Sequence, residues 1–351
     1  MKTLGRAAAA VTAALAVLTG CSGGDDDPAG APDRSGSAPG GPPGERIRGI
    51  TLPAWDTGDY DRPEAVRYLR QIRDTGARWV VFTPTWYQDG RKRSAIRTTG
   101  ETVSDHGVRR IVRLAHAEGL KVLLKPHVDL VGGGDRAEIR PADPDAWFAS
   151  YRTFITHYAR LARELDVERF AVGTELAGTS GDRARWSRVI DSVREVYPGR
   201  LTYAANYDEY ARIRFWSALD VIGIDAYWPL TDRPTTDPAE LAAGWREVVT
   251  ELAAFSARHH RRVLFTEAGY VSQRGTTTAP YSWTVSDRTG EEEQAAAYQA
   301  LLTAFEDRRW WAGVCWWMWD DWPDSGETPA RLAYTPHGKP AEQVLRRWWR
   351  G

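Results

Sequence analysis

The chain has 351 residues, 42% of them hydrophobic, and its 46 basic and 47 acidic residues leave a net charge of −1. This length suits one large domain or two modest ones, and the balanced charge gives no electrostatic case for nucleic acid or an anionic membrane surface. The 17 Trp and 14 Tyr residues, against 8 Phe, favour surfaces that pair an apolar face with a polar edge.

The first 45 residues are not expected to belong to the folded domain. A basic start, "MKTLGR", precedes the apolar run "AAAAVTAALAVLTG", and this pattern predicts a signal peptide over residues 1–20. The run ends in "LTGC", which resembles the lipobox of bacterial lipoproteins and implies that Cys21 is lipidated; plain secretion is the alternative. Only Cys315 would then remain, so no internal disulfide is possible. Residues 21–45, rich in Gly, Pro, Ser and Asp, predict a flexible tether that holds the domain at the extracellular face of the membrane.

From residue 46 onward, short apolar runs alternate with longer amphipathic ones. Eight runs are candidate strands, and most are continuously apolar, as expected for parallel strands covered on both faces. They cover residues 47–55, 77–86, 120–130, 169–176, 200–207, 219–228, 261–270 and 312–319. Eight such units over roughly 300 residues predict one α/β domain, a (β/α)8 TIM barrel, over residues 46–351.

Amphipathic segments between these runs predict helices, with Asp61, Asp143 and Asp237 as expected N-caps. The candidates cover residues 61–77, 143–166, 236–260 and 289–308, and the terminal "RRWWR" predicts a helix that packs its tryptophans on the barrel. A doubly wound open sheet is the alternative. Its Gly-rich phosphate turn is missing, however, since the first strand ends in "PAWDTGDYD".

Polar or aromatic residues end all eight candidate strands, and in such a barrel the C-terminal strand ends form the active-site mouth. Glu175 and Glu267 end the fourth and seventh strands, which lie nearly opposite each other. Two facing carboxylates are the minimum machinery for cleaving a glycosidic bond. The alternative is that each glutamate forms a structural ion pair with a nearby Arg. The other candidates are Trp55, Asp56, Trp86, Tyr87, Gln88, His127, Asp129, Asn206, Asp225, Tyr227, Trp317, Trp319 and Asp320.

Four motifs in chain order, "VGTEL", "IGIDAYWPL", "FTEAGY" and "WWMWDDW", resemble glycoside hydrolase family 113 of the clan A retaining enzymes. That family contains β-1,4-mannanases, and the resemblance covers residues 46–349. It implies that Glu175 is the acid/base and Glu267 the nucleophile. It also implies that the hydroxyl of Tyr227 lies near the nucleophile.

The same resemblance implies that Trp317 or Trp319 forms the floor under the cleaved sugar and that His127 contacts a sugar. Thr174 stands where many clan members have an Asn that holds the sugar 2-hydroxyl, so the identity of the sugar stays open. Asn206 on the next strand is a candidate for the missing amide. The remaining expected substrate-binding residues are Trp55, Trp86, Asp225 and Asp320.

These observations lead to a hypothesis of double displacement on a mannan-type polysaccharide or oligosaccharide. Glu267 should be ionised, and Glu175 should be protonated near neutral pH. We expect a monomer that needs no metal or organic cofactor, because His106, His127 and Asp129 lack metal-ligand spacing. The alternatives are a xylanase or glucanase, or a sugar-binding lipoprotein that has lost catalysis on the same barrel.

Overall fold

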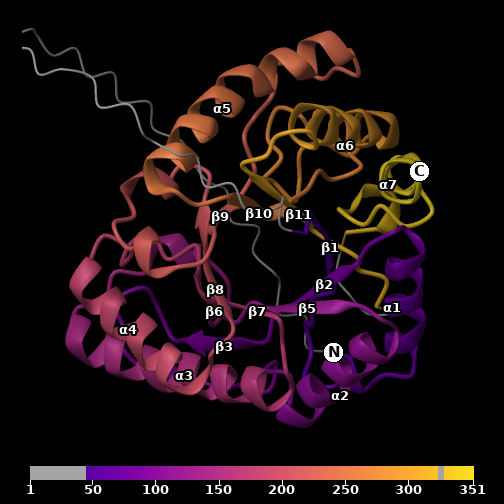
Figure 1. The fold of residues 1–351 in the computed structure, drawn as a ribbon. Coiled ribbons are helices and arrows are strands. Elements are labelled where there is room, and N and C mark those ends of the chain that lie inside the picture. The colour runs from indigo at the N-terminus through magenta and orange to yellow at the C-terminus, as the bar shows by residue number, and fades with distance from the viewer. Residues whose placement is uncertain (1–44, 323–327) are drawn as a thin grey trace, which may run out of the picture.

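Eight parallel strands close into a barrel in the order β1-β11-β10-β9-β8-β7-β5-β2 (Figure 1). The computed structural model describes residues 45–322 and 328–351. The barrel strands are β1 (Ile47–Thr51), β2 (Trp79–Phe82), β5 (Lys121–Leu124), β7 (Arg169–Thr174), β8 (Arg200–Asn206), β9 (Ile222–Asp225), β10 (Val263–Ala268) and β11 (Trp311–Trp316). The predicted (β/α)8 barrel is therefore confirmed, with a strand in each of the eight candidate runs.

Helices surround the barrel in the described part of the chain. They are α1 (Glu64–Asp74), α2 (Asp105–Ala117), α3 (Pro144–Glu164), α4 (Arg183–Val196), α5 (Pro238–His259), α6 (Glu291–Phe305) and α7 (Pro340–Arg350). Between β8 and β9, two 3₁₀ turns, η3 (Tyr210–Arg212) and η4 (Trp216–Ala218), take the place of an α-helix. The barrel is thus covered less regularly on this side than elsewhere (Figure 1).

Helix starts follow the predicted capping chemistry in two of three cases. Asp143 and Asp237 are the N-caps of α3 and α5, since each side chain accepts a hydrogen bond from a backbone N–H of the first turn. The prediction of Asp61 for α1 is wrong. The N-cap there is Pro63, and Asp61 belongs to the preceding 3₁₀ turn η1 (Asp59–Asp61).

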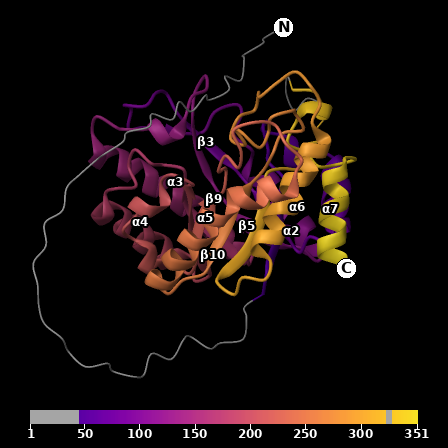
Figure 2. The ribbon, with the colours of Figure 1, turned by 90° about the horizontal axis from the view of Figure 1, so that it is seen from above.

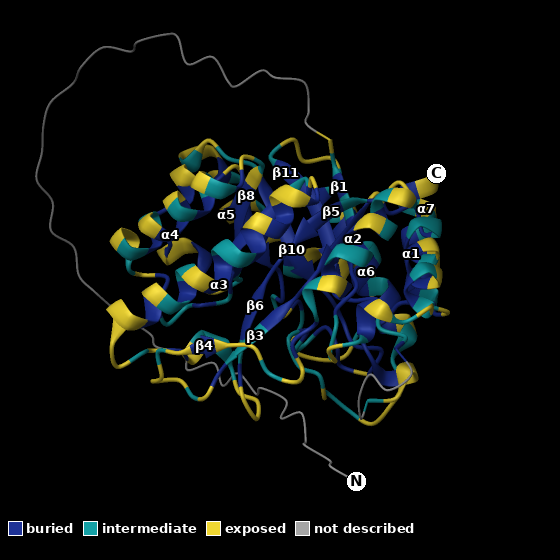
Figure 3. Cartoon of the chain, turned by 90° about the horizontal axis from the view of Figure 1, so that it is seen from below, coloured by how far each residue is buried: buried dark blue, intermediate teal, exposed yellow. Residues whose placement is uncertain are grey.

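Burial explains why the strand sequences are continuously apolar. Every residue of β2, β9, β10 and β11 is buried, and the barrel strands form the dark blue centre of Figure 3. One large apolar cluster lies between the strands and the helices. A second, smaller cluster alternates with it along the strands and fills the barrel interior, and it consists of Ile47, Trp79, Val81, Leu123, Ala171, Val221, Leu264, Ala312 and Cys315.

A three-stranded side sheet, which the sequence did not predict, extends the second and third units beyond the barrel. It has the order β4-β3-β6, with β3 (Thr85–Gln88), β4 (Ile96–Arg97) and β6 (His127–Leu130). Strands β3 and β6 follow β2 and β5 directly and pair in parallel. Each predicted long strand is broken at a proline, Pro84 or Pro126, because proline cannot donate a ladder hydrogen bond.

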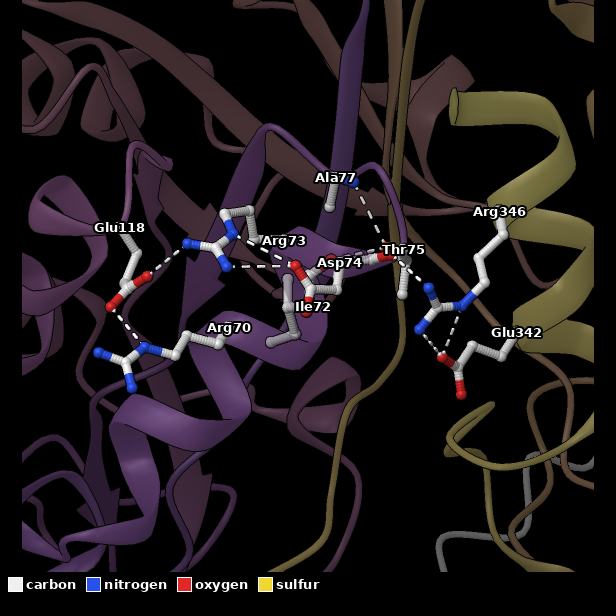
Figure 4. A network of polar contacts seen from close by, with 9 residues as sticks. All are labelled: Arg70, Ile72, Arg73, Asp74, Thr75, Ala77, Glu118, Glu342 and Arg346. Carbon is white, nitrogen blue, oxygen red and sulfur yellow. Dashed lines mark hydrogen bonds and ion pairs between the residues drawn. The ribbon is translucent and has the colours of Figure 1, made fainter. Parts of the chain in front are cut away.

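The C-terminal helix α7 is fastened to the end of α1, as Figure 4 shows. Arg346 donates to the carbonyl oxygen of Asp74 at 2.7 Å and pairs with Glu342 at 2.6 Å. Trp349 is buried and Trp348 is half-buried, and the Trp348 N–H donates to Gln299 of α6 at 3.1 Å. The terminal tryptophans thus form part of a helix, as predicted, and pack on the helices around the barrel.

The predicted signal peptide, Cys21 and all of the tether except Glu45 lie outside the described residues, so these features stay predictions. Within the part of the chain that the structure describes, no helix combines the length and the apolar character needed to cross a membrane. The described residues thus account for the barrel and its C-terminal helix.

Candidate active site

Glu267 lies in β10, only 4% exposed, and both of its carboxylate oxygens have a partner. Lys125 Nζ forms an ion pair with Oε1, and the Tyr227 hydroxyl donates to Oε2 at 2.6 Å. Closure of the barrel brings these partners together from positions 142 and 40 residues away in the chain. Both donors hydrogen-bond the carboxylate, so Glu267 is held in one position.

The Lys125 side chain is fully buried between two acids. Besides Glu267, its Nζ lies 4.0 Å from Oδ1 of Asp225, the last residue of β9. Burial opposes the positive charge, but the carboxylates of Asp225 and Glu267 outweigh it and raise the pKa of Lys125 above its ordinary value. Lys125 is therefore a fixed positive charge beneath the mouth of the barrel.

Asp225 is a third acid in the same cluster. It is fully buried, and its Oδ1 accepts a hydrogen bond from the Thr266 hydroxyl at 2.7 Å. Its Oδ2 has no hydrogen-bond partner among the described residues. Burial raises the pKa of Asp225 to about 7; Lys125 opposes this rise and the charge of Glu267 adds to it. Asp225 therefore changes its protonation near neutral pH.

Glu175 follows β7 directly and has φ of +54°, in the left-handed region that residues with a side chain rarely adopt. Its N–H donates to the carbonyl oxygen of Ala204 in β8 at 2.8 Å, which keeps the chain attached to the barrel. Two residues earlier, a Cβ on Gly173 would lie 2.8 Å from the side chains of Trp186 and Tyr203. The turn that presents Glu175 is thus both strained and closely packed, as is common at functional sites.

The Glu175 carboxylate is 20% exposed, and its Oε2 lies 3.1 Å from Nη1 of Arg136. Burial and then the charge of Asp225 raise the pKa of Glu175 well above its ordinary value. The charge of Glu267 adds to this rise, whereas Arg136 and Lys125 oppose it. The two glutamates therefore belong to one electrostatic cluster, in which Glu175 is the group that holds a proton near neutral pH.

Arg136 comes from a 3₁₀ turn, η2 (Arg136–Glu138), and its Nε also donates to Asp129 in β6 at 2.8 Å. It thereby connects the side sheet to Glu175. The sequence indicated neither Lys125 nor Arg136 as site residues. Lys125 gave a weak signal, a lone cation after the apolar run "KVLL", and Arg136, in the loop "VGGGDRAE", gave none.

Trp317, the residue after β11, provides an apolar wall beside the acids and is 8% exposed. The ring of His127 stacks on it at 6.4 Å with an angle of 18°, and Lys125 Nζ lies 5.8 Å from its centroid. Trp55 and Trp283 contact it edge-on at 6.2 and 6.4 Å. The prediction that Trp317 faces the mouth is consistent with this position next to Lys125, the partner of Glu267.

His127 is 3% exposed, and its Nε2 has no hydrogen-bond partner among the described residues. Burial, followed by the charges of Arg136 and Lys125, holds the pKa of His127 well below its ordinary value. The ring is therefore neutral at physiological pH. A neutral imidazole with a free nitrogen at this position is suited to a hydrogen bond with a sugar hydroxyl.

Three further predicted residues, Trp55, Asp320 and Asn206, border the cluster. The indole N–H of Trp55 donates to Oδ2 of Asp320 at 2.9 Å, which fixes the orientation of Trp55 against Trp317. Asn206 ends β8 directly opposite Asp225 in the register of the two strands. Both positions agree with the expected ring of polar and aromatic residues at the barrel mouth.

The structure does not bring Trp86 and Trp319 into this cluster. The Trp86 ring packs 5.5 Å from Phe154 of α3, and its N–H donates to the Tyr158 hydroxyl at 3.0 Å, because Trp86 belongs to the side sheet. Trp319 is fully buried and packs on His337 at 4.7 Å. The expectation that Trp319 faces the mouth is corrected, since β11 ends at Trp316 and strand alternation no longer applies beyond it.

The charges of this site are supplied by side chains. Among the described residues, no group of three or more His, Cys, Asp or Glu side chains could hold a metal ion. The arrangement instead offers one carboxyl group that a lysine and a tyrosine hold in place, Glu267, and one whose pKa is raised by burial and neighbouring acids, Glu175. Two carboxyl groups in such different environments can act as nucleophile and general acid.

Comparison with known proteins identifies the family. The sequence model described as Glycoside Hydrolase Family 113 matches residues 53–339. A solved GH113 β-1,4-mannanase complex is 27% identical, with 88% of this chain and 99% of that chain covered and a TM-score of 0.78. The GH113 β-mannanase AaManA from Alicyclobacillus acidocaldarius, in complex with ManMIm, is 30% identical, with 87% and 97% covered and a TM-score of 0.78.

A β-glucuronidase from Faecalibacterium prausnitzii shares only the fold, at 16% identity and a TM-score of 0.63, with 87% of this chain and 49% of that chain covered. A search of curated proteins found no match. The family match spans every barrel strand except β1 and all the charged residues of the site described above. The chain therefore belongs to Glycoside Hydrolase Family 113 and is a glycoside hydrolase.

Proposed function

We propose that the protein is a β-mannanase that cleaves β-1,4-linked mannan-type polysaccharide with retention of configuration, with Glu267 as nucleophile and Glu175 as acid/base. The observation that carries this proposal is the opposite electrostatic environment of two carboxyl groups in one cluster. Lys125 and Tyr227 both contact the Glu267 carboxylate, while burial and neighbouring acids raise the pKa of Glu175. The GH113 β-mannanase structures, at 27% and 30% identity, support the choice of substrate.

In the first step, a carboxylate oxygen of Glu267 attacks the anomeric carbon, and the bond from that carbon to the glycosidic oxygen breaks. Glu175 gives its proton to the departing oxygen, so the leaving sugar departs as a neutral alcohol. The new ester removes the negative charge of Glu267. Lys125 then keeps Asp225, 4.0 Å away, as its remaining anionic neighbour.

In the second step, water attacks the anomeric carbon and the ester bond to Glu267 breaks. Glu175 now accepts a proton from that water. The loss of charge on Glu267 lowers the pKa of Glu175, because Glu267 was one of the groups that raised it. Glu175 therefore acts as a base in the half-reaction that needs one, and the second inversion restores the original anomeric configuration.

Sugar recognition is assigned to the groups around this cluster. Trp317 and Trp55 supply apolar faces for the sugar rings. The unpartnered Nε2 of His127 and Oδ2 of Asp225 are placed for sugar hydroxyls, with Asn206 in place of the amide that Thr174 lacks. Asp320 orients Trp55 and completes the expected set.

Product analysis on mannan, glucomannan, xylan and β-glucan tests the substrate, with Glu267→Ala as the inactive reference. We expect oligosaccharides from mannan and glucomannan and no product from the Glu267→Ala protein. NMR of the first-formed anomer should show the β configuration.

Three outcomes would contradict this assignment. If only xylan or β-glucan gave product, the proposed mannan-type substrate would be wrong, but the proposed mechanism would stand. An inverted first product would exclude Glu267 as nucleophile. Binding without cleavage on every polymer would indicate a sugar-binding protein.

A further inference from the structure

The strand starts of this barrel carry basic residues almost without exception. In seven of the eight strands, a cation is the first residue or stands one or two residues before it; the exception is β9, which follows Asp220. The seven are Arg46 (β1), Arg78 (β2), Lys121 (β5), Arg169 (β7), Arg200 (β8), Arg262 (β10) and Arg309 (β11). Because all eight strands are parallel, these cations gather at one end of the barrel, opposite the mouth.

Some neighbouring charges at this end are neutralised by ion pairs. Lys121 pairs with Glu45, and Arg73 of α1 pairs with Glu118 at 2.6 Å (Figure 4). Arg48 pairs with Glu306 at 3.3 Å. These ion pairs neutralise part of the positive charge at this end of the barrel, but within the described part of the chain other cations there are in no ion pair.

Three of the seven cations are exposed and have no ion-pair partner among the described residues. They are Arg78, Arg200 and Arg309, at the starts of β2, β8 and β11. In the barrel order, β11 and β2 flank β1 on its two sides, while β8 lies across the barrel from them. The unneutralised charge is therefore spread around the whole end of the barrel rather than gathered at one corner.

A fourth cation is orphaned near the centre of this end. The Nε and Nη1 atoms of Arg169 are buried without a hydrogen-bond partner among the described residues. Its guanidinium lies 5.9 Å from the ring centroid of Trp79, and Lys121 Nζ lies 5.7 Å from the same ring. Burial, followed by the charge of Arg200, lowers the pKa of Arg169 to about 10. Two donor atoms of Arg169 are therefore left unsatisfied beneath this end of the barrel, which adds positive charge to it.

We propose that this strand-start face, defined by the exposed Arg78, Arg200 and Arg309, docks on the anionic phospholipid surface of a membrane. Lys and Arg side chains near an anionic leaflet each add to binding, and phosphate accepts the fork of donors that a guanidinium offers. The near-zero net charge of the whole chain predicted no such contact, but that sum does not show that basic residues are grouped at the strand starts. The partner follows from charge complementarity and from the place where the chain enters the barrel.

The first strand begins at Ile47 on this same face, so the preceding residues, which include the predicted lipid-attachment site Cys21, join the barrel here. A lipid chain and a basic patch are the two signals that together give stable membrane attachment. Docking through the strand-start face turns the mouth, with Glu175 and Glu267, away from the membrane and toward polymeric substrate. The inference stands independently of which glycan is cleaved.

Vesicle co-sedimentation tests the proposal with the full chain carrying Cys21→Ser, so that no lipid is attached and all variants share one N-terminus. We expect binding to phosphatidylglycerol-containing vesicles that exceeds binding to pure phosphatidylcholine and weakens as salt is raised. The triple variant Arg78→Glu, Arg200→Glu and Arg309→Glu should bind the anionic vesicles at least about tenfold more weakly.

A matched triple variant at the mouth end, Arg91→Glu, Lys92→Glu and Arg93→Glu, changes the net charge equally and should retain the binding. An unchanged melting temperature in both triple variants shows that each is folded. Equal losses in the two variants would mean that net charge alone controls binding, and this would overturn the proposal. So would binding that is insensitive to anionic lipid, or binding that the strand-start variant retains in full.

Discussion

The two carboxyl groups proposed as catalytic are held in different ways. Glu267 lies inside a strand, nearly unexposed, with an ion pair to Lys125 and a hydrogen bond from Tyr227. Glu175 lies just past a strand, 20% exposed, on a left-handed backbone, and its charged partner is Arg136 from a loop. Glu267 is held by buried side chains of the barrel wall. The pKa of Glu175 is instead lowered in part by Arg136, which comes from a loop next to the side sheet.

This difference teaches that the two roles need different mechanical support. A nucleophile must stay ionised and in place through the attack, so buried and fixed donors suit it. An acid/base must gain and lose a proton within one turnover, so weaker and more exposed partners suit it. Substitutions around Glu267 should therefore affect both activity and stability, and those around Glu175 mainly the pH profile.

The largest effect is expected from Glu267→Gln. This change keeps the shape of the side chain but removes the nucleophile, so turnover on polysaccharide should fall by more than the roughly 10²–10⁴-fold typical of losing a general acid or base. Initial-rate kinetics on the best substrate measure the loss. Glu306→Gln, in the ion pair with Arg48 at the other end of the barrel, serves as the control and should keep wild-type turnover.

A smaller loss, about 10²–10⁴-fold, is expected from Glu175→Gln on polysaccharide. An aryl glycoside with a good leaving group needs no proton in the first step, so glycosylation of the enzyme should be nearly normal with that substrate. The wild-type rate should fall as pH rises through the raised pKa of Glu175, because the general acid loses its proton, and this alkaline limb should vanish in the variant. A variant that lost equal activity on both substrates would refute the acid/base role.

Lys125→Met should lower both turnover and stability, because Lys125 is the ion-pair partner of Glu267. Removal of the cation takes away the ion-pair partner that holds Glu267 in place, so turnover should fall. The change also leaves buried acids without their partner, and breaking a buried ion pair costs about 3–5 kcal/mol of unfolding free energy. Denaturant unfolding measures this cost.

Adding Asp225→Asn to Lys125→Met separates the two effects. The double variant has one fewer unpaired buried acid and should regain part of the stability, but it should not regain the turnover. If both returned together, Lys125 would serve the fold and not the nucleophile.

The smallest effect is expected from Arg136→Gln. Arg136 lowers the pKa of Glu175, so its removal should raise that pKa further and move the alkaline limb to higher pH. Stability should change by no more than about 1 kcal/mol, because the pair is partly solvated. Arg140 is an exposed residue close to Arg136 in the chain, and Arg140→Gln should leave the pH profile unchanged. An equal shift in that variant would mean that the loss of any nearby positive charge, and not of Arg136 in particular, moves the pKa of Glu175.

The barrel and the two glutamates could be predicted from the sequence because the patterns that indicate them lie within short, continuous stretches of the chain. Continuous apolar runs mark buried strands, and the "TE" pairs of "VGTEL" and "FTEAGY" stand at the ends of such runs. The partners of those glutamates were not accessible. Lys125 is 142 residues from Glu267, and the two side chains meet only because the barrel closes. Nothing in the local sequence around Lys125 indicates this contact.

The misplaced tryptophans have a related cause. The prediction for Trp319 extended strand alternation beyond the end of β11, and the prediction for Trp86 extended β2 through Pro84. In both cases the chain leaves the barrel ladder, and the faces of its residues are then set by new neighbours. Sequence periodicity holds only as far as the hydrogen-bonded strand continues.

The left-handed backbone at Glu175 has a consequence for attempts to engineer this protein. A residue with φ of +54° is accommodated at least cost by glycine, so Glu175→Gly should relieve strain in the same change that abolishes proton transfer. A selection for thermal stability alone would therefore favour variants that have lost the Glu175 carboxyl group. Libraries built to make this hydrolase more robust need an activity screen in every round, because at this position durability and turnover oppose each other.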